Sequence, residues 1–317
     1  MNLLYLLSKL KKPITKILKP LDRGFLKKYK KDILNRCPPV FIIGAPRTGS
    51  TIFYLLVTAY WDIDYITNFQ CRLHKIPSVG CWLHKILFSN KTHENFKSRH
   101  GKTEGVNGPS ECGGFWYNWF PKDRHYVDEG EIDRETKNVI RKTINSIVST
   151  NKRILFFKNM NCGQRIRALS EIIPEAIFIY CKREPLYVGQ SLLLTREAVH
   201  GSRQKWWSIM PKEYSQIIKH SPERQVIEQI KYIEKQIEED LNKYYKDNYL
   251  EVKYGELIKN PKKQLECLRA KLKEKGLNIE LRNNYKNMPS MPSGNNKKID
   301  DETFLKLKKF VSNLLES

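Results

Sequence analysis

The sequence predicts a three-layer α/β/α fold with a central parallel sheet. Short apolar runs of strand type alternate with longer segments of helical period, which is the pattern of repeated strand–helix–strand units. Two of the apolar runs end in short loops that carry arginine and hydroxyl residues and lead into a helix. The chain has 317 residues, 40% apolar and 11% aromatic, which suits one large globular domain.

The composition also limits the partners. The formal net charge is +23, from 57 Lys and Arg against 34 Asp and Glu. Nucleic acid, an anionic membrane surface or anionic small molecules could each use this charge. Because the lysines are scattered and no nucleic-acid-binding motif is visible, we expect no nucleic-acid partner. Seven dispersed cysteines without metal-type spacing predict no metal site and a reducing, cytoplasmic compartment.

Residues 1–36 form a segment that we separate from a single domain at 37–317. Leucine and isoleucine recur at three- and four-residue spacing from Leu3 to Leu21, lysines fill the other side, and two prolines interrupt the pattern. This predicts a basic amphipathic segment, which either lies on the inner face of an anionic membrane or packs on the domain. The chain contains no run of 18 apolar residues, so we expect no transmembrane helix.

The stretch 40–56 reads VFIIGAPRTGSTIFYLL, a strand, a glycine-bounded turn and a helix start. This geometry directs backbone N–H groups and the positive end of a helix at one spot, which suits a phosphate. Gly49 and Thr51 match the second glycine and the hydroxyl of the nucleotide P-loop, but Ser50 stands in the place of its lysine. We interpret the turn as a cradle for one 5′-phosphate, with Arg47 as an added cation.

A second predicted strand, 176–182, ends in Arg183-Glu184-Pro185, and Ser191 follows on the next predicted helix. Arginine offers a fork of donors for a dianion, and serine adds a hydroxyl donor. With both loops in this order, the chain resembles the sulfotransferases that use 3′-phosphoadenosine 5′-phosphosulfate (PAPS). The first loop is similar to their PRTGS loop for the 5′-phosphosulfate. The second is similar to their R-D-P-x5-S element for the 3′-phosphate, with Glu184 in place of Asp.

The resemblance covers roughly residues 40–268 and is greatest to bacterial and carbohydrate-type sulfotransferases. It implies a P-loop NTPase-like sulfotransferase fold and metal-free transfer of a sulfuryl group from PAPS to an acceptor hydroxyl, of a carbohydrate or a lipid-linked glycan. Arg47 is also implied to stabilise charge in the reaction. The residues that the resemblance assigns to PAPS binding are Arg47, Thr48, Gly49, Ser50, Thr51, Arg183 and Ser191.

The remaining elements continue the alternation. Apolar periodicity predicts helices at 82–88, 135–149, 166–173, 221–245, 262–275 and 301–315, strands at 154–157 and 249–254, and a mixed strand-to-loop region at 63–73. Ligands bind at the carboxyl ends of parallel strands. Since Arg47, Lys158 and Arg183 each follow a predicted strand end, we expect one cleft to collect them.

The acceptor hydroxyl requires a general base. The glycine-rich segment 100–114 precedes an aromatic run, and this combination suits an acceptor loop, because sugar rings stack on aromatics and carboxylates bind hydroxyls. Glu111 is the first candidate, since bacterial relatives carry a similar G-P-x-E segment before aromatics. Glu104, His100 and His74 remain open as alternatives.

Two further groups of side chains are weaker candidates for the site. An Arg- and Trp-rich stretch could line the acceptor side, and a late polar loop could close on the 3′-phosphate. The first group is Arg196, Arg203, Trp206 and Trp207, and the second is Lys297 and Lys298.

Two other functions remain open from the sequence. One is a P-loop-type small-molecule kinase, against which the missing lysine at Ser50 counts. The other is a non-catalytic membrane-surface protein on the same scaffold. Neither the acceptor nor the oligomeric state follows from the sequence, because one scaffold serves many acceptors.

Overall fold

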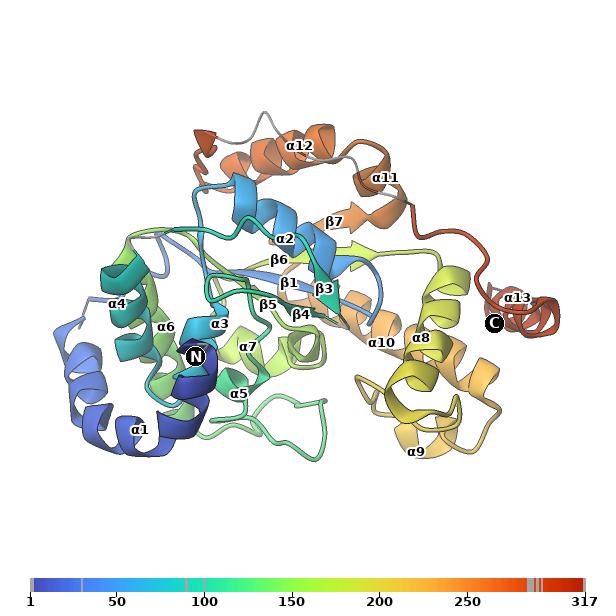
Figure 1. Ribbon diagram of the computed structural model, residues 1–317, viewed down its shortest axis with the longest axis horizontal. Helices are drawn as coiled ribbons and strands as arrows, with labels where there is room; N and C mark the ends of the chain where they lie inside the picture. The colour runs from blue at the N-terminus through green and yellow to red at the C-terminus, as the bar shows by residue number, and fades with distance from the viewer. Residues whose placement is uncertain are drawn as a thin grey trace.

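A five-stranded parallel sheet forms the centre of the molecule (Figure 1). The structure is a computed structural model that describes residues 3–29, 31–88, 91–99, 101–283, 288, 291 and 293–315. The strand order is β2-β5-β1-β6-β7, and each neighbouring pair is parallel. The strands are β1 (Val40–Gly44), β2 (Asp64–Tyr65), β5 (Leu155–Lys158), β6 (Ile177–Lys182) and β7 (Tyr249–Lys253). The predicted parallel sheet is confirmed.

Side chains of the central strands alternate between two cores. In β1, Phe41 and Ile43 lie in one core and Val40 and Ile42 in the other, as the two-residue period of a strand requires. One core is covered by α2 (Ser50–Tyr60), α11 (Tyr254–Lys259) and α12 (Pro261–Glu274). The other is covered by α6 (Arg134–Asn151), α7 (Ile166–Ile172), α8 (Pro185–His200) and α10 (Pro222–Tyr244). The sheet therefore lies between two helical layers, which confirms the three-layer architecture.

The long helices agree with the apolar periodicity, and the short elements do not. Helix α13 (Asp301–Leu315), which packs on α8 and α10, begins and ends where the sequence predicts. The region 63–73 instead contains β2 and the short helix α3 (Asn68–Arg72). A capping box starts α3: the Thr67 hydroxyl accepts from the Gln70 N–H at 3.2 Å, and Gln70 Oε1 accepts from the Thr67 N–H at 2.7 Å.

Short elements also break up the glycine-rich segment. Strands β3 (Ser98–Arg99) and β4 (Lys102–Thr103) form an antiparallel hairpin, and α5 (Gly113–Trp116) begins the aromatic run. The other elements are α4 (Pro77–Phe88), the 3₁₀ helix η1 (Met160–Gln164) and α9 (Tyr214–Ile217).

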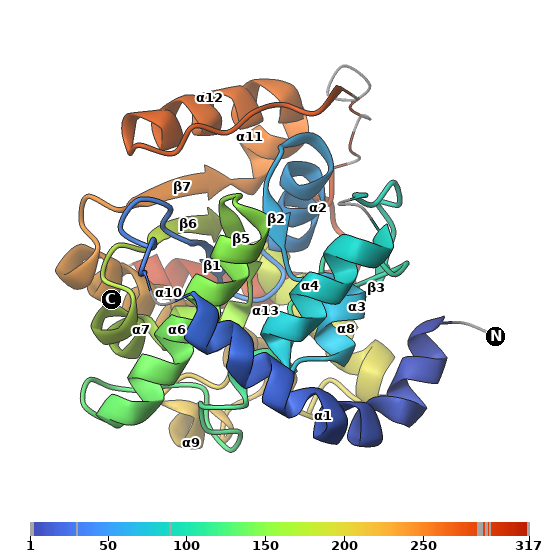
Figure 2. The same ribbon diagram turned by 90° about the vertical axis from the view of Figure 1, so that its left-hand side faces the viewer.

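Helix α1 (Leu3–Lys28) packs along one side of the domain, against α3 and α4 (Figure 2). Ile14, Leu18 and Phe25 contact a small apolar cluster that is built around α3 and α4. The Asp22 carboxylate accepts from the Val79 N–H at 3.0 Å and so satisfies a free N–H in the first turn of α4. Desolvation raises the pKa of Asp22 to about 6. In the described part of the chain, none of the helices is both long and apolar enough to span a bilayer.

Candidate active site

The loop between β1 and α2 makes a tight turn that its glycines allow. Gly49, directly before α2, has a left-handed φ of 87°, and a Cβ there would lie 2.3 Å from the Tyr254 ring. Arg47 also has a positive φ of 71°, a conformation that non-glycine residues rarely adopt and that is often found at functional loops. The buried Thr48 hydroxyl donates to the Ala45 carbonyl at 2.9 Å, so this side chain shapes the turn from inside.

Arg183, at the end of β6, joins the second loop to the first. Its Nη1 donates to the main-chain oxygen of Arg47 at 3.0 Å, and its Cζ lies 4.3 Å from the ring centroid of Tyr254. Nη2 donates to the Gly294 carbonyl at 2.7 Å, and Nε donates to Asn295 Oδ1 at 2.8 Å. Burial lowers the pKa of Arg183, and the nearby charge of Arg47 acts in the same direction. The two motifs that were found separately in the sequence therefore lie in one site.

Ser191 orients the first loop from helix α8. Its hydroxyl accepts from Arg47 Nε at 2.9 Å, which holds the guanidinium in place. Ser191 is not among the side chains that line the cavity described below. Burial lowers the pKa of Arg47, because the charged guanidinium has lost hydrating water. An anion bound next to Arg47 would therefore stabilise the charged form.

A polar segment, 293–298, lies against Arg183 and is held by the neighbouring helix. The buried Gln190 makes two hydrogen bonds to its backbone: Nε2 donates to the Asn296 carbonyl at 2.9 Å, and Oε1 accepts from the Lys298 N–H at 2.7 Å. The Lys297 ammonium forms an ion pair with Asp301 at the start of α13. The segment thus approaches the loops through backbone groups, with its Lys297 charge directed to α13.

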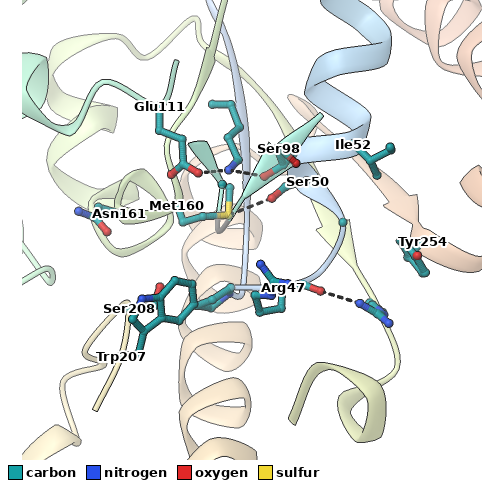
Figure 3. A pocket seen from close by; sticks show the side chains of 16 residues that line it. Arg47, Ser50, Ile52, Ser98, Glu111, Met160, Asn161, Trp207, Ser208 and Tyr254 are labelled. Atoms are coloured by element: carbon teal, nitrogen blue, oxygen red, sulfur yellow. Dashed lines mark hydrogen bonds and ion pairs between the residues drawn. The ribbon is translucent and has the colours of Figure 1, made fainter. Parts of the chain in front are cut away.

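An ion pair between Lys158 and Glu111 forms one wall of the site (Figure 3). The Lys158 ammonium also donates to the Thr51 hydroxyl at 3.1 Å, and its side chain is only 3% exposed. The Glu111 main-chain oxygen accepts from Asn159 Nδ2 at 2.9 Å, which fixes this loop to the end of β5. A Cβ at Gly101 would lie 2.8 Å from Glu111 Oε1, so the β3–β4 turn covers the carboxylate closely.

These groups line one open cavity of about 330 Å³, a size within the range of small-molecule sites (Figure 3). It brings together the three cations that the sequence places after strand ends, and the single carboxylate of Glu111. The lining residues are Pro46, Arg47, Gly49, Ser50, Thr51, Ile52, Ser98, Gly101, Glu111, Lys158, Met160, Asn161, Arg183, Trp207, Ser208 and Tyr254. The cavity therefore combines a polar, cationic floor with a single candidate base.

The four candidate bases occupy different positions. Glu111 lines the cavity. Glu104 is exposed and accepts from Asn95 Nδ2 at 2.9 Å outside it. The His74 ring packs next to Gly114, away from the lining residues. His100 lies outside the described residues.

Of the four candidates Arg196, Arg203, Trp206 and Trp207, only Trp207 lines the cavity. Arg196 is fully buried and donates to Gln225 Oε1 at 2.8 Å, with its Cζ 4.9 Å from the Trp206 ring centroid. Burial lowers the pKa of Arg196 to about 10. The expectation that Arg196 and Trp206 line the acceptor side is therefore wrong, because both side chains instead stabilise the loop that carries Trp207. Arg203 instead pairs with Glu197.

This support fixes the loop that presents Trp207. Gln229 Nε2 donates to the carbonyls of Trp207 at 3.2 Å and Ile209 at 2.8 Å. Trp206 Nε1 donates to the carbonyl of Ser208, whose φ is 74°. Trp207 and Ser208 thus form a preorganised wall on the opposite side of the cavity from Ile52 and Tyr254 (Figure 3).

Asn161 and Ser98 were not predicted as site residues from the sequence, and Lys158 was predicted only to lie in the cleft. Their signal was weak: Asn161 lies in the 3₁₀ helix after β5, and Ser98 belongs to a two-residue strand. Such elements show no periodicity in a sequence. Among the residues that the structure describes, no group of three or more His, Cys, Asp or Glu side chains could hold a metal ion.

Comparison with known proteins gives a consistent result. A family model described as "Sulfotransferase family" matches residues 38–275. A crystal structure of sulfotransferase STF9 from Mycobacterium avium is similar at 17% identity and a TM-score of 0.49, over 92% of this chain and 72% of that one. The sulfotransferase domain from the Synechococcus PCC 7002 olefin synthase is similar at 13% identity and a TM-score of 0.43, over 87% and 94%. No curated protein sequence matches the chain.

Proposed function

Because the chain belongs to the sulfotransferase family, we propose that it transfers a sulfuryl group from PAPS to a hydroxyl group of a carbohydrate or a lipid-linked glycan. The observation that carries this proposal is the arrangement of Lys158, Thr51 and Glu111 on one wall of a cavity whose other cationic side chains are Arg47 and Arg183. This set offers cations for an anionic donor and one carboxylate for a proton.

The donor set fits a nucleotide with two separate anionic groups. The first turn of α2 has free N–H groups, and Gly49, Ser50 and Thr51 line the cavity there. These groups and Arg47 would hold the 5′-phosphosulfate. Arg183, with its forked donors, would hold the 3′-phosphate. Burial lowers the pKa values of both arginines, so an anionic group bound next to each guanidinium would stabilise its charge.

PAPS, when bound, supplies the sulfuryl group and leaves as adenosine 3′,5′-bisphosphate, so that one S–O bond breaks and one forms. Lys158 donates to the Thr51 hydroxyl, and its ammonium would stabilise the negative charge of the leaving nucleotide. The Glu111 carboxylate takes the proton of the acceptor hydroxyl, and Lys158 keeps that carboxylate in position. Trp207 and Asn161 form the acceptor wall, where a sugar ring can stack and hydrogen-bond.

A comparison of two nucleotides tests the proposal. Adenosine 3′,5′-bisphosphate should raise the melting temperature of the protein strongly, and ATP with Mg²⁺ should raise it little. The kinase alternative makes the opposite prediction. It is weakened by Ser50, whose hydroxyl donates to the Met160 sulfur at 3.4 Å where a P-loop would present a lysine. A shift with ATP alone would overturn the proposal.

Catalysis itself requires a second measurement. Radiolabelled PAPS incubated with the protein and a panel of glycan and lipid-linked acceptors should give labelled product. Nucleotide binding without product in every class of hydroxyl acceptor would favour the non-catalytic alternative on the same scaffold.

We place the enzyme in the cytoplasm, since all seven cysteines are free thiols, as in reducing compartments.

A further inference from the structure

The outward side of α1 is unusually cationic. Its exposed cations include Lys16, Lys19, Arg23 and Lys27, and the helix contains one acidic residue, Asp22, which is buried against α4. In the described ranges, no ion pair neutralises these four cations. A helix that uses its only carboxylate inward and leaves its cations outward presents a strongly positive surface.

Apolar side chains interrupt this positive surface. Ile17 is 73% exposed and Leu21 is 43% exposed, one helical turn apart. Of the large apolar side chains that are exposed in the described part of the chain, two more, Ile86 and Leu87, lie at the end of α4, which packs against α1. Exposed apolar residues next to cations are typical of helices that lie in the interface of an anionic bilayer.

A groove follows the same helix toward α6. It has a volume of about 820 Å³, and its lining includes the cations Arg23, Lys27 and Lys142 and the apolar side chains Leu26 and Val139. The groove also contains one carboxylate, Asp32, which is paired with Arg141. This groove could receive an anionic headgroup with part of its apolar chain, because it combines further cations with apolar side chains.

We propose that the outer face of α1 docks on an anionic lipid bilayer. We define this α1 docking face as Lys16, Ile17, Lys19, Leu21, Arg23 and Lys27. The cations attract the anionic headgroups, and Ile17 and Leu21 enter the boundary between headgroups and acyl chains. The opposite side of α1 stays on the domain through Leu18, Phe25 and Asp22, so docking requires no change in the fold.

The docking face is connected to the acceptor side of the cavity. Helix α1 contacts α3, whose first residue Asn68 donates to the Thr103 carbonyl at 3.1 Å and the Gly105 carbonyl at 2.9 Å. Thr67, before α3, pairs with Pro109 in an antiparallel bridge, two residues before Glu111. A bilayer bound at the outer side of α1 would therefore be separated by one helix from α3, which is hydrogen-bonded to the segment that presents the proposed base. This position suits an acceptor hydroxyl carried by a lipid-linked molecule.

Charge reversal at two matched places tests the proposal. The first variant is Lys16→Glu with Lys19→Glu and Lys27→Glu. The control is Lys263→Glu with Lys271→Glu and Lys273→Glu on α12, a helix of the other helical layer (Figure 1). These three substitutions change the net charge by the same amount as those on α1. Each protein is sedimented with vesicles of phosphatidylcholine alone and with phosphatidylglycerol added, and its melting temperature is recorded. No donor or acceptor is present, so the result is independent of the proposed reaction.

We expect the wild type and the α12 control to bind only the vesicles that contain phosphatidylglycerol. The α1 variant should bind them at least about tenfold more weakly, and Ile17→Ser with Leu21→Ser should also weaken binding at unchanged charge. Equal losses in the two charge-reversed proteins would overturn the proposal, because overall charge would then explain binding. If Lys→Glu unfolds the α1 variant, the corresponding Lys→Gln protein decides between the same outcomes.

Discussion

Nη1 of Arg183 donates a 3.0 Å hydrogen bond to the main-chain oxygen of Arg47, 136 residues earlier in the chain. This bond joins the loops that follow the neighbouring parallel strands β6 and β1. The guanidinium that we assign to the 3′-phosphate therefore also fixes the shape of the loop that we assign to the 5′-phosphosulfate. The affinity for the nucleotide should therefore depend on Arg183 both through its contact with the 3′-phosphate and through its effect on the shape of the first loop.

Replacement of Arg183 by Lys should weaken the binding of adenosine 3′,5′-bisphosphate by about 10- to 100-fold, because lysine cannot supply the forked donors. Isothermal titration calorimetry measures this loss. The matched control is adenosine 5′-monophosphate, which lacks the 3′-phosphate and should lose much less. Equal losses for both nucleotides would assign Arg183 to loop structure alone.

Lys158→Met should lower kcat by about 10²- to 10³-fold while donor affinity changes little, because we assign the Lys158 charge to stabilisation of the transition state. The measurement is single-turnover transfer from PAPS, with nucleotide binding followed in parallel. Lys182→Met is the control, since Lys182 is the last residue of β6, the strand that follows β5 along the chain, and pairs with Glu238 outside the cavity. A fall in binding equal to the fall in rate would refute the catalytic role of Lys158.

Glu111→Gln should lower kcat by about 10²- to 10⁴-fold, as expected for loss of a general base, and should leave nucleotide binding intact. Glu104→Gln should retain the wild-type rate, because Glu104 is exposed outside the cavity. The pH profile separates the roles: loss of a base removes the rise of kcat on the acid side. A Glu104 variant that loses more activity than the Glu111 variant would transfer the role.

Trp207→Ala should raise the acceptor KM about tenfold with a smaller change in kcat, because an aromatic wall contributes mainly to binding of a ring. Trp207→Phe should restore most of the affinity. The comparison uses a sugar acceptor and a small alcohol without a ring. If both acceptors lose equally, Trp207 does not act as a stacking surface.

Asp22→Asn should stabilise the protein at neutral pH. Burial raises the pKa of Asp22 from 3.8 to about 6, so the folded state binds more protons between these values and the free energy of unfolding falls as pH rises through this window. The amide avoids this loss, which amounts to about 3 kcal/mol at most. Melting temperatures should differ most at pH 7 and converge near pH 4. A difference in melting temperature that is independent of pH would contradict this prediction.

The parallel sheet and its long helices were predictable because their signals are local. Buried strands such as β1 and β6 are apolar runs, and amphipathic helices such as α6 and α10 repeat every 3.6 residues. Both loops that we assign to the anionic groups of the donor could also be located, because each follows such a strand. Lys158 could be placed in the cleft for the same reason.

The acceptor side could not be predicted to the same extent. Helix α3 has five residues and the β3–β4 hairpin two per strand, too short for a periodic pattern, although the Thr67–Gln70 capping box was readable in principle. Arg196 and Trp207 lie in the same Arg- and Trp-rich stretch, yet one is buried in a polar network and the other lines the cavity. Composition cannot show which of the two side chains is buried and which lines the cavity, because this depends on the hydrogen bonds of both residues with α10.

The close approach of Gly49 to Tyr254 also has a consequence for synthesis on the ribosome. The loop that we assign to the 5′-phosphosulfate is made early, but the aromatic ring that contacts it belongs to α11, which follows β7 much later in the chain. A nascent chain that ends before this ring has emerged has the residues that we assign to phosphate binding without the contact that shapes them. Adenosine 3′,5′-bisphosphate should therefore bind stalled chains only after that later helix has left the exit tunnel.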